Sequence, residues 1–108
     1  MLFRSRDCNL LREWRRIAAY ADCRGVTVSP HWFHDLHAPL VAATPNARFV
    51  EFFTDDQVLN FRRLINNQLQ LRDGRVVLRQ GPGLGFEFDE QAVQRYGGQW
   101  ARIDRPAG

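Results

Sequence analysis

Residues 26–33 read Val-Thr-Val-Ser-Pro-His-Trp-Phe, a short β-branched run that leads into a histidine and two aromatic side chains. The apolar run at 26–28 predicts a buried β-strand that ends at His31. Before it, residues 10–23 carry apolar side chains at helical spacing, and Gly25 can end that helix in a left-handed cap. A helix followed by a buried strand is therefore predicted here.

The same order repeats on the C-terminal side of this stretch. A second helix is predicted within residues 33–43, with a late start near Asp35 or a kink, because Pro39 inside a helix removes a backbone hydrogen bond. Residues 47–53 form another apolar run, which carries one acid, Glu51, and predicts a second strand. Helix, strand, helix, strand is the order of parallel α/β proteins, so this fold class is predicted.

The second half of the chain has a different pattern. Residues 69–72 and 75–78 flank Asp73-Gly74, a strong signal for a β-hairpin turn. Asp89 can cap a short final helix that runs to Tyr96. The glycine-rich connector between them lacks the spacing of nucleotide-binding loops, so no phosphate site is predicted.

Length and composition limit the classes of function. The chain has 108 residues, which suits one modest domain and falls short of the roughly 250 residues of a complete (β/α)8 barrel. All fifteen basic residues are arginine, so this chain supplies no lysine for a Schiff base, a general base or a phosphate loop. The arginines are dispersed among twelve acids without a basic stripe, which argues against a nucleic-acid partner despite the net charge of +3.

The sequence contains no apolar run long enough to span a membrane, and no apolar signal core follows the charged residues 1–7. We therefore expect no membrane contact and a cytoplasmic location. Cys8 and Cys23 are expected to be free thiols, because structural disulfides are rare in that compartment.

Two side chains at the predicted strand ends could transfer protons. His31 follows the first strand, at the edge where α/β barrels build their active sites, and histidine exchanges a proton near neutral pH. Glu51 has the matching position on the second strand, where a buried carboxylate is costly unless it is paired. Together they suit proton transfer at a carbon next to a carboxylate. The alternative for Glu51 is a solvent-facing acid or an ion pair with Arg48.

Three histidines, His31, His34 and His37, recur at every third position and could suggest a zinc site. This spacing spreads side chains round a helix beyond a comfortable tetrahedral geometry, so zinc is not favoured. We interpret His34 and His37 as exposed or capping residues of the second helix.

Three motifs follow one another in the chain: Ser29-Pro30-His31-Trp32-Phe33, Ala42-Ala43-Thr44-Pro45-Asn46 and Phe49-Val50-Glu51. In this order, and with this spacing, they resemble the end of the barrel in enolase-superfamily enzymes of the mandelate racemase and muconate lactonizing type. Residues 13–18 resemble the helix before the catalytic strand of that family. Residues 82–85, with Asp89-Glu90, resemble its closing segment.

The resemblance implies an α/β fold made of the last βα units of a (β/α)8 barrel, followed by a hairpin and short-helix tail that packs on a capping domain. Residues 1–108 would be a single partial domain. Within it, residues 1–54 would be the end of the barrel and residues 55–108 a C-terminal return segment. The sequence would then begin just after the sixth barrel strand.

The resemblance also implies a Mg²⁺-dependent racemase or acid-sugar dehydratase, which removes the proton α to a carboxylate. His31 would be the general acid or base of that reaction. Glu51 would hydrogen-bond the substrate carboxylate or the enediolate oxygen. The expected small-molecule partner is a carboxylate or an acid sugar.

The sequence departs from the family pattern where the histidine should be oriented. The family uses an aspartate for this purpose, and counting back along the helix places Arg4 at its position. The metal-binding carboxylates and the lysine-bearing strand lie earlier in the family's barrel, so no metal ligand is expected in this chain. We therefore expect no turnover by the chain alone, and whether it acts as an enzyme stays open. The alternative is a non-catalytic remnant that serves as an oligomerising or interaction domain.

Overall fold

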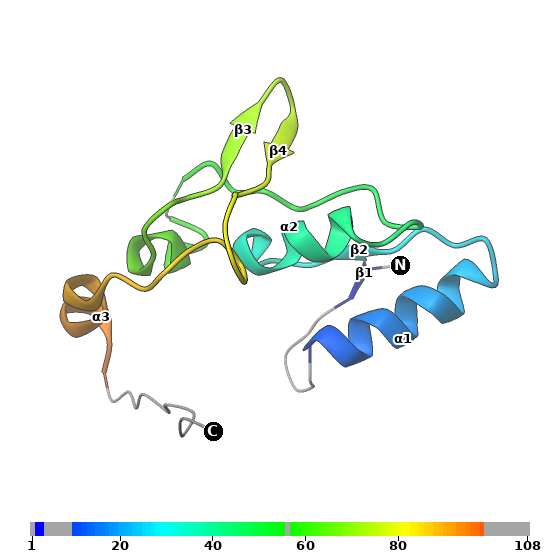
Figure 1. Ribbon diagram of the computed structural model, residues 1–108, viewed down its shortest axis with the longest axis horizontal. Coiled ribbons are helices and arrows are strands. Elements are labelled where there is room, and N and C mark those ends of the chain that lie inside the picture. Colours follow the sequence, from blue (N-terminus) through cyan, green and yellow to red (C-terminus); the bar gives the residue numbers. More distant parts are fainter. Residues whose placement is uncertain (1, 4–9, 56, 99–108) are drawn as a thin grey trace.

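A computed structural model describes residues 2–3, 10–55 and 57–98 (Figure 1). In chain order its elements are β1 (Leu2–Phe3), α1 (Leu10–Asp22), β2 (Ser29–Pro30), α2 (His34–Ala42), the 3-10 helix η1 (Asn60–Leu64), β3 (Gln70–Arg72), β4 (Arg75–Val77) and α3 (Glu90–Tyr96). The described residues thus form a small α/β arrangement, as the sequence predicts.

Helix α1 confirms the amphipathic helix predicted at 10–23. Its inward face carries Trp14, Ala18 and Ala21, all buried, and these pack with Val28 and Val41 in the main core. Apolar residues at this spacing form a stripe along one side of a helix, and the burial of that stripe supplies most of the stability of such a helix.

The end of α1 is shaped by one glycine. Gly25 has a φ of 64°, and the Val26 N–H donates to the Ala21 carbonyl over 2.9 Å. The left-handed region is open to glycine at little steric cost, so the helix ends there as predicted.

The turn at residues 44–46 ties α1 to the end of α2. Trp14 Nε1 donates to Thr44 Oγ1 over 2.9 Å, and the Thr44 hydroxyl donates to the Leu40 carbonyl over 2.6 Å. Asn46 Nδ2 donates to the Ala18 carbonyl over 2.9 Å. These bonds satisfy polar groups beside the core and fix the distance between the two helices.

The β-structure is shorter than predicted. Strand β2 lies at 29–30, parallel to β1, and only Val28 of the predicted 26–28 run takes part in a bridge, with Ala47. The prediction of a strand through residues 47–53 is wrong beyond Ala47, because residues 48–53 are irregular. Parallel strands are stable when neighbours pair along both edges and helices cover both faces, and the described residues supply little of either.

Helix α2 begins at His34, one residue before the expected late start, and it contains Pro39. A proline at this position cannot donate the hydrogen bond that the Asp35 carbonyl would accept in a regular helix. Arg79 Nη1 supplies a donor to that carbonyl instead, over 3.3 Å. A side chain from the second half of the chain thus compensates for the proline.

The hairpin predicted around Asp73-Gly74 is confirmed. Gln70 of β3 pairs with Val77 of β4, and the two turn residues have φ values of 50° and 72°. Positive φ at both positions is the geometry of a type I′ turn, one of the two common two-residue hairpin loops. The hairpin projects away from α1 and α2 (Figure 1).

The last helix is capped as predicted. The Asp89 carboxylate accepts hydrogen bonds from the backbone N–H groups of Gln91 and Ala92, over 2.9 and 3.0 Å. These bonds satisfy two of the free amide donors at the start of α3. Upstream, Ile65 and Phe88 form a β-bridge. In this half of the chain, Leu59, Ile65 and Leu69 are buried.

Among the described residues, no helix is both long and apolar enough to cross a membrane. Cys23 is an exposed free thiol, as predicted. Cys8 and Arg4 lie outside the described residues.

Candidate active site

His31 and Glu51, the two predicted proton-transfer residues, lie side by side. His31 follows β2 directly, and Glu51 lies in the irregular segment after the Ala47 bridge. His31 Nε2 is 3.9 Å from Glu51 Oε2, and their side chains are 18% and 41% exposed. This distance allows an ion pair when the imidazole is protonated, but it is too long for a hydrogen bond.

The backbone after His31 holds the carboxylate. The Trp32 N–H donates to Glu51 Oε2 over 2.8 Å, so this oxygen faces both His31 and the Trp32 peptide. Hydrogen bonds from backbone N–H groups to carboxylates are among the stronger ones in proteins. Glu51 is therefore positioned by the loop that carries the histidine.

That loop has an unusual backbone. Trp32 has a φ of 63°, and Phe33, the residue before α2, has a φ of 44° and a ψ of 49°. Left-handed backbone costs a side-chain-bearing residue roughly 1–2 kcal/mol, so two such residues in succession need surrounding contacts. The Phe33 carbonyl accepts hydrogen bonds from the N–H groups of Leu36 and His37. The Trp32 carbonyl is 2.6 Å from His37 Nδ1.

The interpretation of His34 and His37 as exposed or capping residues is wrong. Both are fully buried, on the same face of α2 as Ala38 and Val41. Burial lowers the pKa of each imidazole below its ordinary value of 6.5. For His34 the negative charge of Asp35 opposes this shift. Both histidines are therefore neutral at physiological pH.

A buried ion pair lies beside these histidines. Arg79 forms an ion pair and hydrogen bond with Asp35, and the two side chains are 3% and 0% exposed. The Arg79 guanidinium also donates to the Asn67 carbonyl. His34 Nε2 lies 3.3 Å from Asp35 Oδ2, without the geometry of a hydrogen bond. The pair joins α2 to the segment after β4.

Aromatic rings lie next to His31 and His34. Trp32 contacts the His31 ring at a centroid distance of 5.6 Å and the Phe53 ring at 6.0 Å, and His34 lies 4.4 Å from the Phe52 ring. Such rings bury apolar surface and reduce the access of water to neighbouring polar groups.

The three histidines do not form a metal site. Within residues 2–3, 10–55 and 57–98, no three His, Cys, Asp or Glu side chains are arranged to hold a metal ion. His37 Nδ1 faces the Trp32 carbonyl, and His34 packs on a phenylalanine ring. The described residues therefore fit neither zinc nor the Mg²⁺ that the resemblance implies.

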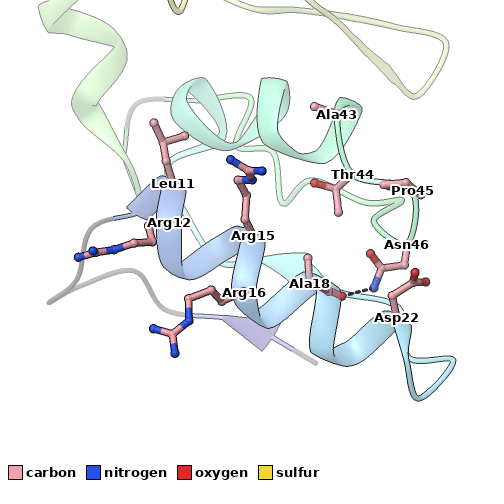
Figure 2. A pocket seen from close by; sticks show the side chains of 11 residues that line it. Leu11, Arg12, Arg15, Arg16, Ala18, Asp22, Ala43, Thr44, Pro45 and Asn46 are labelled. Atoms are coloured by element: carbon pink, nitrogen blue, oxygen red, sulfur yellow. Dashed lines mark hydrogen bonds between the residues drawn. The ribbon is translucent and has the colours of Figure 1, made fainter.

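A groove lies between α1 and the turn after α2 (Figure 2). Arg12, Arg15 and Arg16 line it from the helix, and Thr44 and Asn46 line it from the turn. Asn46 there donates to the Ala18 carbonyl, as the dashed line in Figure 2 shows. Neither His31 nor Glu51 is among its lining residues, and the arginines are exposed. The acid/base pair is therefore the candidate active site.

His31 and Glu51 thus lie next to each other in a small α/β fold, one directly after β2 and the other in the irregular segment after the Ala47 bridge. The chain belongs to the enolase C-terminal domain-like family, whose family model matches residues 7–92. It is 39% identical over 77 residues to the L-talarate/galactarate dehydratase of Salmonella typhimurium, covering 71% of this chain and 18% of that protein.

Solved structures show the same likeness. One is the L-talarate dehydratase of Polaromonas sp. JS666, with Mg and L-glucarate: 32% identity, a TM-score of 0.63, and coverage of 75% of this chain and 21% of that one. A Bradyrhizobium enolase, with magnesium and mandelic acid, gives 29% identity, a TM-score of 0.65, and coverage of 80% and 22%. The predicted relation to the C-terminal part of mandelate racemase-type enzymes is confirmed, and the chain spans about a fifth of these relatives.

Sequence reasoning did not identify His37 and Asp35 as buried residues of α2, or Arg79 as the ion-pair partner of Asp35. A signal for the buried histidine was present, because positions 34, 37, 38 and 41 form one helical stripe. No local signal identified Arg79, since its partner Asp35 lies 44 residues away.

Proposed function

We propose that this chain carries the proton-transfer residues of a mandelate racemase-type active site, with His31 as general acid or base. The observation that supports this is the approach of His31 Nε2 to Glu51 Oε2, at 3.9 Å, in a chain of this family. His31 would take or return the proton on the carbon next to a substrate carboxylate.

Glu51 is proposed to contact the substrate with its second oxygen. Because Oε2 already accepts the Trp32 N–H, Oε1 is the atom left to face a ligand. A hydrogen bond to a substrate carboxylate or enediolate oxygen needs a donor, so Oε1 would have to hold the proton. A donor at this point stabilises the negative charge that develops as the carbon is deprotonated.

The proposed substrate class is an α-hydroxy carboxylate such as an acid sugar. The Polaromonas relative holds L-glucarate and the Bradyrhizobium relative holds mandelic acid, and both molecules carry a C–H and a hydroxyl next to a carboxylate. After loss of that proton, return of a proton to the same carbon gives racemisation. Loss of a hydroxide from the next carbon, which an acid sugar carries and mandelate lacks, gives dehydration.

Mg²⁺ is bound in both relatives, but the described residues of this chain do not fit a metal site. In the proposed enzyme, the metal ligands and the second base come from other parts of the barrel. An enediolate without an electrophile to stabilise it is too costly to form. We therefore expect no racemase or dehydratase turnover by the 108-residue chain alone.

The same proposal assigns the chain to the end of the barrel. Residues 1–54, which hold β1, α1, β2 and α2, would be the last βα units, and residues 55–108 the return segment. The parallel pairing of β1 with β2 and of Val28 with Ala47 supports this assignment.

An interaction domain without catalysis is the second candidate. Large apolar side chains are exposed, among them Phe49 at 69% and Phe88 at 56%. Exposed apolar surface of this kind favours a partner that covers it. A stable oligomer that is indifferent to Mg²⁺ in sedimentation experiments would support this candidate over the enzyme.

The direct test is a chimera in which this chain replaces its matched segment of the Salmonella dehydratase. The chimera would supply the missing parts of the barrel, and we expect dehydration of galactarate that falls by about 10²–10⁴-fold in His31→Ala. Arg48→Ala, at an exposed side chain three positions before Glu51 in the chain, is the control. A folded chimera whose His31→Ala variant keeps full turnover would contradict the proposal.

A further inference from the structure

The Trp32 peptide is the connection between the loop and the carboxylate. Its N–H donates to Glu51 Oε2 over 2.8 Å, which fixes this oxygen 3.9 Å from His31 Nε2. The φ of Trp32, 63°, sets how this N–H is oriented relative to the next peptide group, which carries the Trp32 carbonyl. A bulky side chain rarely adopts that backbone, so something must hold it there.

His37 contacts the carbonyl group of Trp32, whereas Glu51 contacts its N–H. His37 Nδ1 lies 2.6 Å from the Trp32 carbonyl oxygen, and a carbonyl only accepts hydrogen bonds, so Nδ1 must carry the hydrogen. His37 Nε2 is buried without a hydrogen-bond partner among the described residues. Burial also lowers the pKa of His37, which keeps the ring neutral. The ring is therefore the neutral tautomer with its hydrogen on Nδ1.

We propose that His37 is a positioning residue for the proton-transfer pair. It anchors the Trp32 carbonyl, and the Trp32 N–H then reaches Glu51 and sets the distance of the carboxylate from His31. We call the contacts from His37 through Trp32 to Glu51 the relay. Its role in proton transfer rests on the proposed function, but the contacts themselves can be tested in the 108-residue chain alone.

His34 provides a matched comparison. It lies on the same helix, is as fully buried as His37, and contacts Asp35 and Phe52 rather than the Trp32 carbonyl. If His37 served only to fill the core, replacing either histidine would loosen the same structure. If His37 positions the peptide, only its replacement acts on Trp32.

The test measures amide hydrogen exchange in the ¹⁵N-labelled chain. His37→Leu should speed exchange of the Trp32 amide by about tenfold relative to the Val28 amide, the order of change expected for loss of one hydrogen bond. Val28 is the internal reference, because its N–H donates to the Asn46 carbonyl. His37→Asn places an amide donor near the position of Nδ1 and should restore most of the protection.

Equal acceleration of Trp32 and Val28 in His37→Leu would overturn the proposal, as would the same selective effect in His34→Leu. A second test uses the wild-type chain, so it does not depend on whether a variant folds. The ¹⁵N shifts of the His37 ring should show hydrogen on Nδ1, and hydrogen on Nε2 would contradict the relay. These readouts do not use catalysis, so the relay and the proposed function can each fail separately.

Discussion

His31 Nε2 lies 3.9 Å from Glu51 Oε2, and the Trp32 N–H that follows the histidine donates to the same oxygen over 2.8 Å. The two residues are twenty positions apart, and the nine-residue helix α2 lies within that interval. The loop and helix together therefore set the geometry of the pair.

The buried ion pair between Asp35 and Arg79 should be essential for stability. Arg79→Met removes the charge partner of a fully buried carboxylate and a donor to the Asp35 carbonyl, so unfolding free energy should fall by about 3–5 kcal/mol. Urea unfolding measures this. Arg75→Met, on the exposed hairpin, should stay within about 0.5 kcal/mol of wild type.

If the loss comes from an unpaired charge, Asp35→Asn should recover part of it in the double variant with Arg79→Met. A double variant less stable than Arg79→Met alone would contradict this explanation.

Gly85 should tolerate alanine less well than Gly74. Both have a φ of 72°. A Cβ at Gly85 would lie 2.6 Å from the Arg79 Cβ, whereas a Cβ at Gly74 would have no neighbouring atom within 4 Å. Gly74→Ala therefore measures the cost of the backbone alone, and Gly85→Ala should lose a further 1–3 kcal/mol, roughly, through overpacking. Equal losses in thermal unfolding would mean that Arg79 moves aside freely.

The core contact of Trp14 should contribute strongly. Trp14→Ala removes a side chain that is 2% exposed and leaves a cavity, at a cost of about 3–5 kcal/mol. Trp14→Phe retains a ring but loses the bond to Thr44, and should cost less. Tyr20→Ala, on the exposed side of α1, is the control and should change stability little. Comparable losses for Tyr20→Ala and Trp14→Ala would contradict the assigned face of the helix.

Stability should fall as the pH drops below about 6.5. Burial lowers the pKa of His34 and His37, so near this pH the unfolded chain binds protons that the folded chain does not. This part of the stability is therefore complete above the unfolded pKa of 6.5 and declines as the pH falls towards the lowered pKa values of the folded chain. Arg62 and Arg79 add positive charge near His34, and Asp35 opposes them. Urea unfolding from pH 8 to 5.5 measures the slope.

The matched variants for this prediction are His34→Gln and His37→Asn, which replace a titrating ring with a neutral amide. Each should flatten the decline between pH 7 and 5.5. An unchanged slope in both would assign the pH dependence to other groups.

The helices, the hairpin and the cap of α3 were predictable because their signals are local. Gly25 ends α1, Asp73-Gly74 makes the turn and Asp89 caps the last helix, each through its own backbone or its immediate neighbours. The strand expected at residues 47–53 was not, because residues 48–53 are apolar enough for a strand but do not pair with any of the described strands.

In the candidate site too, the features with a local sequence signal were predictable, and those that depend on contacts between separate segments were not. His31 and Glu51 were found from their positions after apolar runs, and the structure brings them together. The environment of His37 and Asp35 depends on Trp32 carbonyl geometry and on Arg79, which no periodic pattern reveals. Burial of polar residues is decided by such contacts, so sequence reasoning interpreted His37 as an exposed or capping residue.

The most direct test of the proposed function is deuterium incorporation at the carbon next to the carboxylate. The dehydratase chimera carrying this chain would be incubated with Mg²⁺ and a substrate or slow analogue in D₂O, and the α-position followed by NMR. We predict exchange in the chimera and its loss in His31→Ala, with Arg48→Ala unaffected. Exchange that continues unchanged without the His31 imidazole would contradict the assignment of this residue to proton transfer.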